Sequence, residues 1–109
     1  MSGLYMSIAE RGDVSVLRLY GPLNAATAGD LHAMLTPFRG RSVLLDLTEC
    51  PSLDLDGLLA LAAFYDHTRE AGGSMHLDPV PPPLARYLLE HHMGYLLAPA
   101  SPGAPEPSK

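Results

Sequence analysis

The segment from residue 43 to residue 78 has the pattern of a strand, a helix and a second strand. Val43 to Leu47 is a nearly continuous apolar run, which is typical of a central strand covered on both faces. After a break at Pro51, apolar residues recur at the i, i+3, i+4 and i+7 spacing of an amphipathic helix. They are Leu58, Leu61, Ala62 and Tyr65. Gly72-Gly73 ends this helix, and Met75 to Asp78 resumes as a strand. This order predicts a sheet that is at least partly parallel.

The preceding residues predict a hairpin and a helix. Leu4 to Glu10 and Val14 to Tyr20 flank the turn pair Gly12-Asp13, as the two strands of a β-hairpin do. Gly21-Pro22 stops the second strand. A helix is then expected from Ala28 to Leu35, and either Asn24 or Thr27 can cap it.

The C-terminal part predicts one more helix and a tail. The proline run 81–83 begins a helix from about Leu84 to His92, and a short strand is expected near Tyr95 to Leu97. The order ββαβαβα predicts an α/β fold, a single domain over residues 1–98 in which a mixed β-sheet is packed with helices. Residues 99–109 hold four of the chain's 11 prolines without a periodic apolar pattern, so we expect a Pro-rich flexible tail.

Composition excludes several classes of function. The 109 residues carry 12 acidic and 7 basic side chains, a formal net charge of −5, and the only lysine is Lys109. We expect no nucleic-acid partner, because phosphate binding relies on clustered Lys and Arg. The longest nearly apolar run, Leu58 to Tyr65, is shorter than the about 20 residues that cross a bilayer, so we expect no membrane insertion. Residues 1–13 have no basic start followed by an apolar stretch, so we expect no signal peptide. The single cysteine, Cys50, favours the reducing cytoplasm.

Four acidic residues cluster between residues 46 and 56, from the end of the predicted strand to the start of the predicted helix. They are Asp46, Glu49, Asp54 and Asp56. Asp56 precedes the predicted central helix, where it can act as an N-cap worth about 1 kcal/mol. The string Leu-Asp-Leu-Asp-Gly also resembles the nucleophile and acid pair of haloacid-dehalogenase-like phosphatases, with Asp54 and Asp56 in those roles. However, residues 50–52 separate the pair from the strand, Leu58 replaces that family's Thr, and the folded part contains no lysine to steady a phosphoryl group. We therefore expect no catalytic residues.

The potential metal ligands are scattered. His91 and His92 are adjacent, so on a helix they point about 100° apart and cannot hold one ion. His32, His67 and His76 occur singly, and the residues around Asp54 lack the ligand spacing of a calcium loop. Cys50 has no basic neighbour that would activate its thiol. We expect neither a metal nor a cofactor.

The predicted central helix also has an apolar outer face. If Leu58 and Leu61 point inward, then an advance of about 100° per residue turns another set of side chains outward. These are Leu59, Ala60, Ala63 and His67. Either another element covers this face, or it binds a protein partner.

Taken in order, these segments resemble a STAS domain, the family of the anti-sigma factor antagonists. The resemblance rests on the strand 14–20, Gly21-Pro22-Leu23-Asn24 after it, the strand 43–47, the segment 53–58 and Ala71-Gly72-Gly73. It spans roughly residues 5 to 97. It implies a cytoplasmic module of bacterial signal transduction and transcription regulation without catalytic activity. The family's prototypes bind an anti-sigma factor that is also a serine kinase of the GHKL type, and they release it when a serine at the start of the central helix is phosphorylated.

The resemblance places the phosphoacceptor position at Asp56. The family pattern Asp-Ser-Ser/Thr-Gly aligns with Asp54, Leu55, Asp56 and Gly57, so the hydroxyl is missing. The single charge of an aspartate imitates the about −1.5 to −2 of a phosphoserine only in part. Asn24 also departs from the family, which often has Asp there. The expected partner-binding residues are Asn24, Asp54, Asp56, Gly57, Leu59, Ala60 and Ala63.

Three classes of function remain open. The first is a binding module that regulates an anti-sigma factor. The second is a STAS-like adaptor subunit of a transport or sensor complex, where a phosphorylatable serine is not needed. The third is a phosphatase-like enzyme that uses Asp54 and Asp56. The sequence leaves the oligomeric state open.

Overall fold

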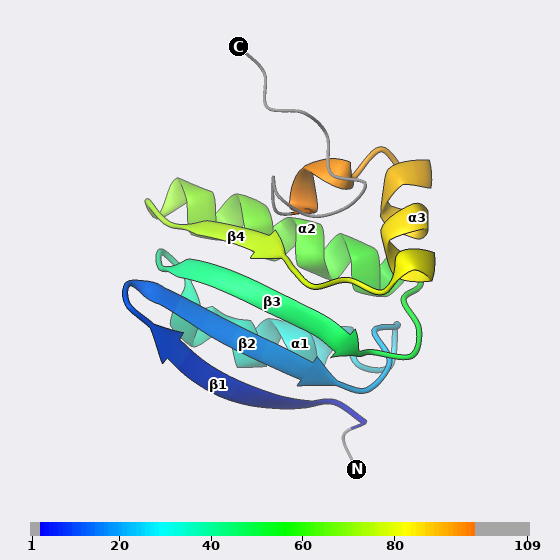
Figure 1. The fold of residues 1–109 in the computed structure, drawn as a ribbon, viewed down its shortest axis with the longest axis horizontal. Helices are drawn as coiled ribbons and strands as arrows, with labels where there is room; N and C mark the ends of the chain where they lie inside the picture. Colours follow the sequence, from blue (N-terminus) through cyan, green and yellow to red (C-terminus); the bar gives the residue numbers. More distant parts are fainter. Residues whose placement is uncertain (1–2, 98–109) are drawn as a thin grey trace.

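The computed structural model describes residues 3–97, which form a four-stranded sheet with helices on both sides (Figure 1). The strands are β1 (Tyr5–Arg11), β2 (Val14–Tyr20), β3 (Ser42–Glu49) and β4 (Ser74–Leu77), and they lie in this order across the sheet. β1 runs antiparallel to β2, whereas β2, β3 and β4 are parallel to their neighbours. The mixed α/β sheet expected from the sequence is therefore confirmed.

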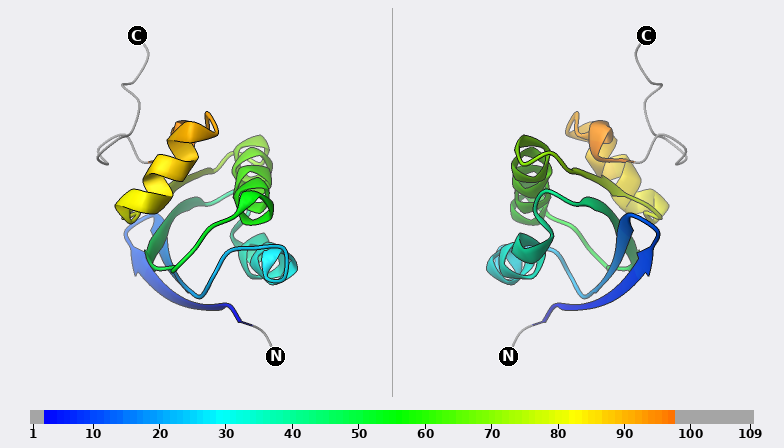
Figure 2. Two further views of the ribbon diagram at one scale, coloured as in Figure 1. Left: turned by 90° about the vertical axis from the view of Figure 1, so that its right-hand side faces the viewer. Right: turned by 90° about the vertical axis from the view of Figure 1, so that its left-hand side faces the viewer.

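Three α-helices and two short 3₁₀ helices connect the strands. They are α1 (Ala28–Leu35), α2 (Leu55–Glu70), α3 (Pro82–Glu90), η1 (Thr36–Phe38) and η2 (Gly94–Leu96). Figure 2 shows α1 and α2 together on one face of the sheet and α3 on the other side. None of the described helices is long and apolar enough to span a membrane.

The N-terminal hairpin forms as its sequence indicates. Arg11 pairs with Val14 across the two-residue turn Gly12-Asp13, and Gly12 has a φ of 63°. A positive φ at the first turn residue matches the type II′ turn, whose twist suits that of the flanking strands. The turn therefore sets the register of the whole pair, from Arg11 and Val14 to Tyr5 and Tyr20.

The core lies between the sheet and the pair α1 and α2, and it consists largely of leucines. Leu45 and Leu47 of β3 and Leu58 and Leu61 of α2 are fully buried there. The opposite face of β3 is less covered than expected, because Leu44 is only half-buried. A groove of about 470 Å³, whose lining includes Leu44 and Pro79, remains open on that face. The expectation that β3 is covered on both faces is therefore wrong.

The strand expected near Tyr95 to Leu97 is also wrong. Gly94–Leu96 forms a 3₁₀ helix, and only Leu97 makes an isolated bridge, to Leu77 of β4. Local bonds use the backbone donors that a strand would need, since Leu96 N donates to the Met93 carbonyl and Leu97 N to that of Gly94. The tail predicted over residues 99–109 lies outside the described residues.

Candidate functional site

Two loops meet at the carboxyl ends of β2 and β3. Because these strands are parallel, the chain leaves both of them at the same end, the carboxyl end. Open α/β sheets commonly place their binding sites at this end of the strands. Leu23 N donates to the Ser52 carbonyl at 3.0 Å, and Asp54 N donates to the Leu23 carbonyl at 3.0 Å. The loop of residues 21–27, which follows β2, is called the residue 24 loop. The two hydrogen bonds bring this loop and the start of α2 side by side.

Asp54 caps the helix that begins here. Its backbone is extended, with φ −110° and ψ −175°, and its carboxylate accepts a hydrogen bond from Gly57 N at 3.0 Å. The interpretation of Asp56 as the N-cap is therefore wrong. Asp56 instead lies in the first turn of α2 with an exposed side chain, where its charge interacts favourably with the helix dipole.

Gly57 lets α2 pack directly on the residue 24 loop. It is buried, and a Cβ atom built on it would lie 2.4 Å from the Leu23 carbonyl oxygen. No side chain fits at that separation. Gly57 thus positions Asp54 and Asp56 against the loop and presents no exposed surface of its own.

Asn24 has a structural task in the same loop. Its Oδ1 accepts from Thr27 N at 3.1 Å, and its own N–H donates to Thr27 Oγ1 at 3.0 Å. Thr27 occupies the N-cap position of α1 but makes no side-chain capping bond to that helix. The two residues proposed as alternative caps therefore act together and fix the turn that precedes α1.

The exposed side of α2 carries an apolar strip beside Asp56. Leu55 and Leu59 are each 49% exposed, and Ala63 follows one turn later and is also exposed. Ala60 is half-buried and packs against the core, so it belongs to this side only in part. Leu55 was absent from the expected partner-binding set, although its i, i+4 spacing with Leu59 indicates the same helix side. We call Leu55, Asp56, Leu59 and Ala63 the α2 surface.

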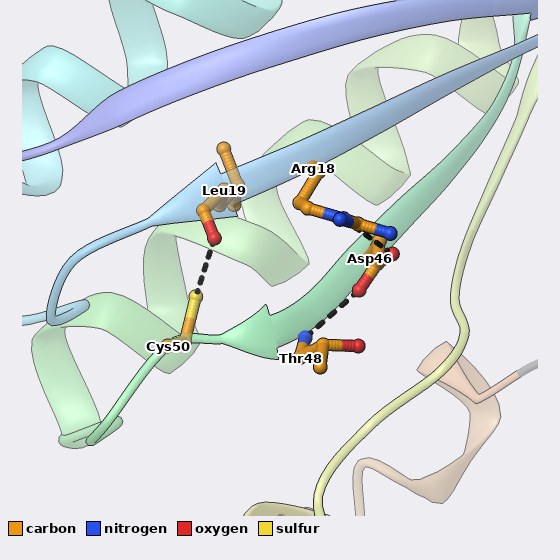
Figure 3. A network of polar contacts seen from close by, with 5 residues as sticks. All are labelled: Arg18, Leu19, Asp46, Thr48 and Cys50. Atoms are coloured by element: carbon orange, nitrogen blue, oxygen red, sulfur yellow. Dashed lines mark hydrogen bonds and ion pairs between the residues drawn. The ribbon is translucent and has the colours of Figure 1, made fainter.

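A polar network braces β2 and β3 just before the two loops (Figure 3). Asp46 Oδ2 accepts from Arg18 Nε at 2.9 Å, and Asp46 Oδ1 accepts from Thr48 N at 2.8 Å. Burial by itself would raise the pKa of the Asp46 carboxyl, but the bonds from Thr48 and Arg18 outweigh it and hold the pKa below its usual value. Asp46 is therefore a structural charge that links the two strands, rather than part of the α2 surface.

Cys50 also contacts β2, close to this polar network (Figure 3). Its Sγ lies 3.6 Å from the Leu19 carbonyl oxygen, and the side chain is buried. Burial, followed by the negative charges of Asp46 and Glu49, raises the pKa of the thiol to about 12. A thiol with such a pKa is almost entirely protonated near neutral pH and is a poor nucleophile. Among residues 3–97, no group of three His, Cys, Asp or Glu side chains is arranged to hold a metal ion.

Comparison with known proteins identifies the family. The family model of the STAS domain matches residues 5–93. This chain belongs to the STAS-domain family. A search of curated protein sequences found no match. The loops after β2 and β3 and the start of α2 lie within the matched range of the STAS domain.

Solved structures share the STAS fold at low sequence identity. The Bacillus cell fate determinant SpoIIAA in its phosphorylated form has a TM-score of 0.65 and 14% identity, over 90% of this chain and 91% of that one. The STAS domain of an antisigma-factor antagonist from Rhodobacter sphaeroides has a TM-score of 0.59 and 20% identity, over 68% and 84%. The murine anion transporter Solute Carrier 26 family member A9 has a TM-score of 0.67 and 19% identity, over 75% of this chain. This chain spans only 14% of that transporter, and only 20% of another chain with the fold, Mglu.

Proposed function

We propose that this STAS domain is a non-catalytic, cytoplasmic regulator that binds a protein partner of the anti-sigma factor class, a GHKL-type serine kinase. The observation that carries the proposal is the α2 surface itself. Two exposed leucines and an exposed acid lie at the start of α2, next to a loop that is hydrogen-bonded to the segment from which the helix begins. Exposed apolar side chains rimmed by charge are a common mark of protein-binding sites.

Asp56 gives this surface a permanent negative charge. Its exposed carboxylate lies on the first turn of α2, the position that the family resemblance assigns to a phosphorylatable serine. Phosphorylation at that position would add charge and acceptor oxygens only when a kinase acts, whereas the aspartate carries its charge without modification. We infer that this domain is not switched by phosphate at position 56, and that it still binds the kinase because the single charge of an aspartate imitates a phosphoserine only in part. The nearest hydroxyl before α2 is that of Ser52, which is exposed.

A matched pair of leucine variants tests the binding surface. Leu59 is 49% exposed on α2 and Leu89 is 43% exposed on α3, so arginine at either position disturbs little packing. Affinity pull-down from the native lysate is expected to recover a GHKL-type kinase with the wild type and with Leu89→Arg, but not with Leu59→Arg. Thermal melts of all three proteins supply the control. Recovery of the kinase by a folded Leu59→Arg protein would refute the proposed surface.

A second candidate is an adaptor subunit in a transport complex. The observation in its favour is the shared fold with part of the murine anion transporter. The same pull-down separates the two candidates, because transporter subunits in place of a kinase would favour the adaptor.

The phosphatase alternative would use the carboxylates of Asp54 and Asp56, and in the structure one oxygen of Asp54 accepts the Gly57 N–H as the cap of α2. An assay with Mg²⁺ on the wild type and on Asp54→Asn would revive this alternative only if the wild type showed turnover that the variant lost.

A further inference from the structure

The two edges of the sheet are treated differently by the fold. At the β4 edge, Tyr65 of α2 lies edge-on to both His76 of β4 and Tyr95 of η2, with ring centroids 6.2 and 5.0 Å apart. Leu97 adds a parallel bridge to Leu77 on the same edge. Aromatic rings and the returning chain therefore cover β4, which is how proteins commonly protect a strand edge.

The β1 edge has no comparable cover within residues 3–97. β1 pairs only with β2, and Figure 1 shows it at the outer margin of the sheet. Six of its seven residues are exposed, including Tyr5 at 62% and Ile8 at 54%. The strand contains neither Pro nor Lys, and its charges, Glu10 and Arg11, lie only at the hairpin end. An exposed, unpaired edge of this kind is a template for pairing with another strand.

The hairpin register determines which peptide groups face outward. The pair that closes a two-residue turn, here Arg11 and Val14, is hydrogen-bonded, and hydrogen-bonded and non-hydrogen-bonded pairs alternate along an antiparallel ladder. The peptide groups of Ala9, Ser7 and Tyr5 therefore face β2. Those of Met6, Ile8 and Glu10 point away from the sheet, and among the described residues no strand pairs with them.

We propose that this edge pairs with the β1 strand of a second copy of the chain, antiparallel and about a two-fold axis at Ile8. In that register Ile8 lies opposite Ile8 of the second copy, and Met6 lies opposite Glu10. These are the residues whose peptide groups point outward, so every exposed donor and acceptor of the edge is used. Because the axis is normal to the sheet, α1 and α2 of both copies lie on the same side of one continuous sheet.

Charge and side-chain size favour this register over its neighbours. Tyr5 lies opposite Arg11 of the second copy, where the aromatic ring and the guanidinium group can attract each other. The two-fold axis forms this pair twice. No like charges face each other in this register. A shift toward the turn would place Glu10 opposite Glu10, which is unfavourable. A shift toward the N-terminus would require Leu4 to join the strand pair, although Leu4 is only 1% exposed and belongs to the core. The complementary register therefore selects a second copy as the occupant.

Sedimentation velocity over a wide range of protein concentration tests the association. The wild type is expected to dimerise reversibly. Ile8→Lys places like charges opposite each other at the axis and is expected to weaken the dimer by about tenfold or more. Ala33→Lys adds the same charge at an exposed position of α1 and serves as the matched control. A chain that stays monomeric, or a dimer that Ile8→Lys leaves unchanged while the protein remains folded, overturns the proposal.

Cysteine cross-linking tests the register. Hydrogen-bonded antiparallel pairs have Cα atoms about 5.5 Å apart, within the range of a disulfide, so oxidised Ile8→Cys protein is expected to form a covalent dimer. In Met6→Cys protein the new thiols lie four residues apart along the strands, more than about 13 Å, and are expected to remain separate. Cys50 is buried and does not compete. Cross-linking through residue 6, or its absence at residue 8, contradicts this register.

Discussion

Substitution of Gly57 by alanine measures how tightly α2 is held against the residue 24 loop. The added Cβ would lie 2.4 Å from the Leu23 carbonyl oxygen and 2.6 Å from its carbon, whereas non-bonded heavy atoms prefer about 3.5 Å or more. Backbone atoms cannot rotate away as a side chain can, so the start of α2 or the loop must shift by about 1 Å. Such overpacking costs about 1–3 kcal/mol.

A second glycine provides the control. Gly29 lies in α1, and a Cβ there would meet nothing within 4 Å. Gly29→Ala is therefore expected to stabilise the protein by about 0.5–1 kcal/mol, because alanine loses less backbone entropy than glycine in a helix. The same gain offsets part of the penalty at position 57 and leaves a net destabilisation of about 0.5–2 kcal/mol. The same chemical change thus has opposite signs at the two positions.

Urea unfolding followed by circular dichroism provides the assay, since the chain has no tryptophan for fluorescence. For a domain near this size, each kcal/mol lost should also lower Tm by about 4–8 °C. The Gly57→Ala protein is further expected to bind its partner more weakly, because the shift moves Asp56 relative to the loop. If both alanine variants were equally stable, or more stable than the wild type, the close packing of α2 on Leu23 would be refuted.

Three further predictions concern the capping, the ion pair and the thiol. Asp54→Ala should lower the free energy of unfolding by about 1 kcal/mol, because the cap of α2 is lost. Asp54→Asn should keep most of that stabilisation, because asparagine also caps helices. Urea titration distinguishes the two variants. The pKa of Asp46 is lower in the folded state, so the unfolded state takes up a proton first, and stability is lost as the pH falls from about 4 through that lowered pKa. Asp46→Asn should flatten this acid loss in a pH series of melts, and the exposed Asp66→Asn serves as the charge control. Cys50, with its thiol pKa raised to about 12, should react with a thiol reagent at neutral pH only after denaturant is added; rapid reaction of the native protein would contradict its burial.

Local pattern predicted most of the fold because the deciding signals are local. Three local patterns specify their elements without reference to distant residues: the turn Gly12-Asp13, the nearly continuous apolar run 43–47, and the spacing of Leu58 and Leu61. The structure confirms the hairpin, α1, α2, β4 and α3. The predictions that were wrong concern features that tertiary contacts decide. Whether Tyr95 to Leu97 continues as a strand depends on how the chain returns over β4, and no local pattern specifies that return.

The position of the candidate site could be predicted from the sequence, but the structural role of each of its residues could not. The order of motifs places Asn24, Asp54 and Asp56 near one another, and the structure brings their loops together. That Asp54 rather than Asp56 caps α2 depends on where the helix begins, a boundary that sequence patterns rarely fix to one residue. The close approach of Gly57 to Leu23 involves residues 34 positions apart, so it becomes visible only in three dimensions.

We propose that a fixed charge at Asp56 replaces a phosphate switch on a kinase-binding surface. The most direct test of this claim is the intact mass of the wild type and of Asp56→Ser after incubation with the partner kinase and ATP. Asp66→Ser, at another exposed acid of α2, controls for the introduction of a hydroxyl. We expect the mass of one phosphate to be added to Asp56→Ser only. A phosphate on the wild type, for example at Ser52, or none on an Asp56→Ser protein that still binds the kinase, would contradict the claim.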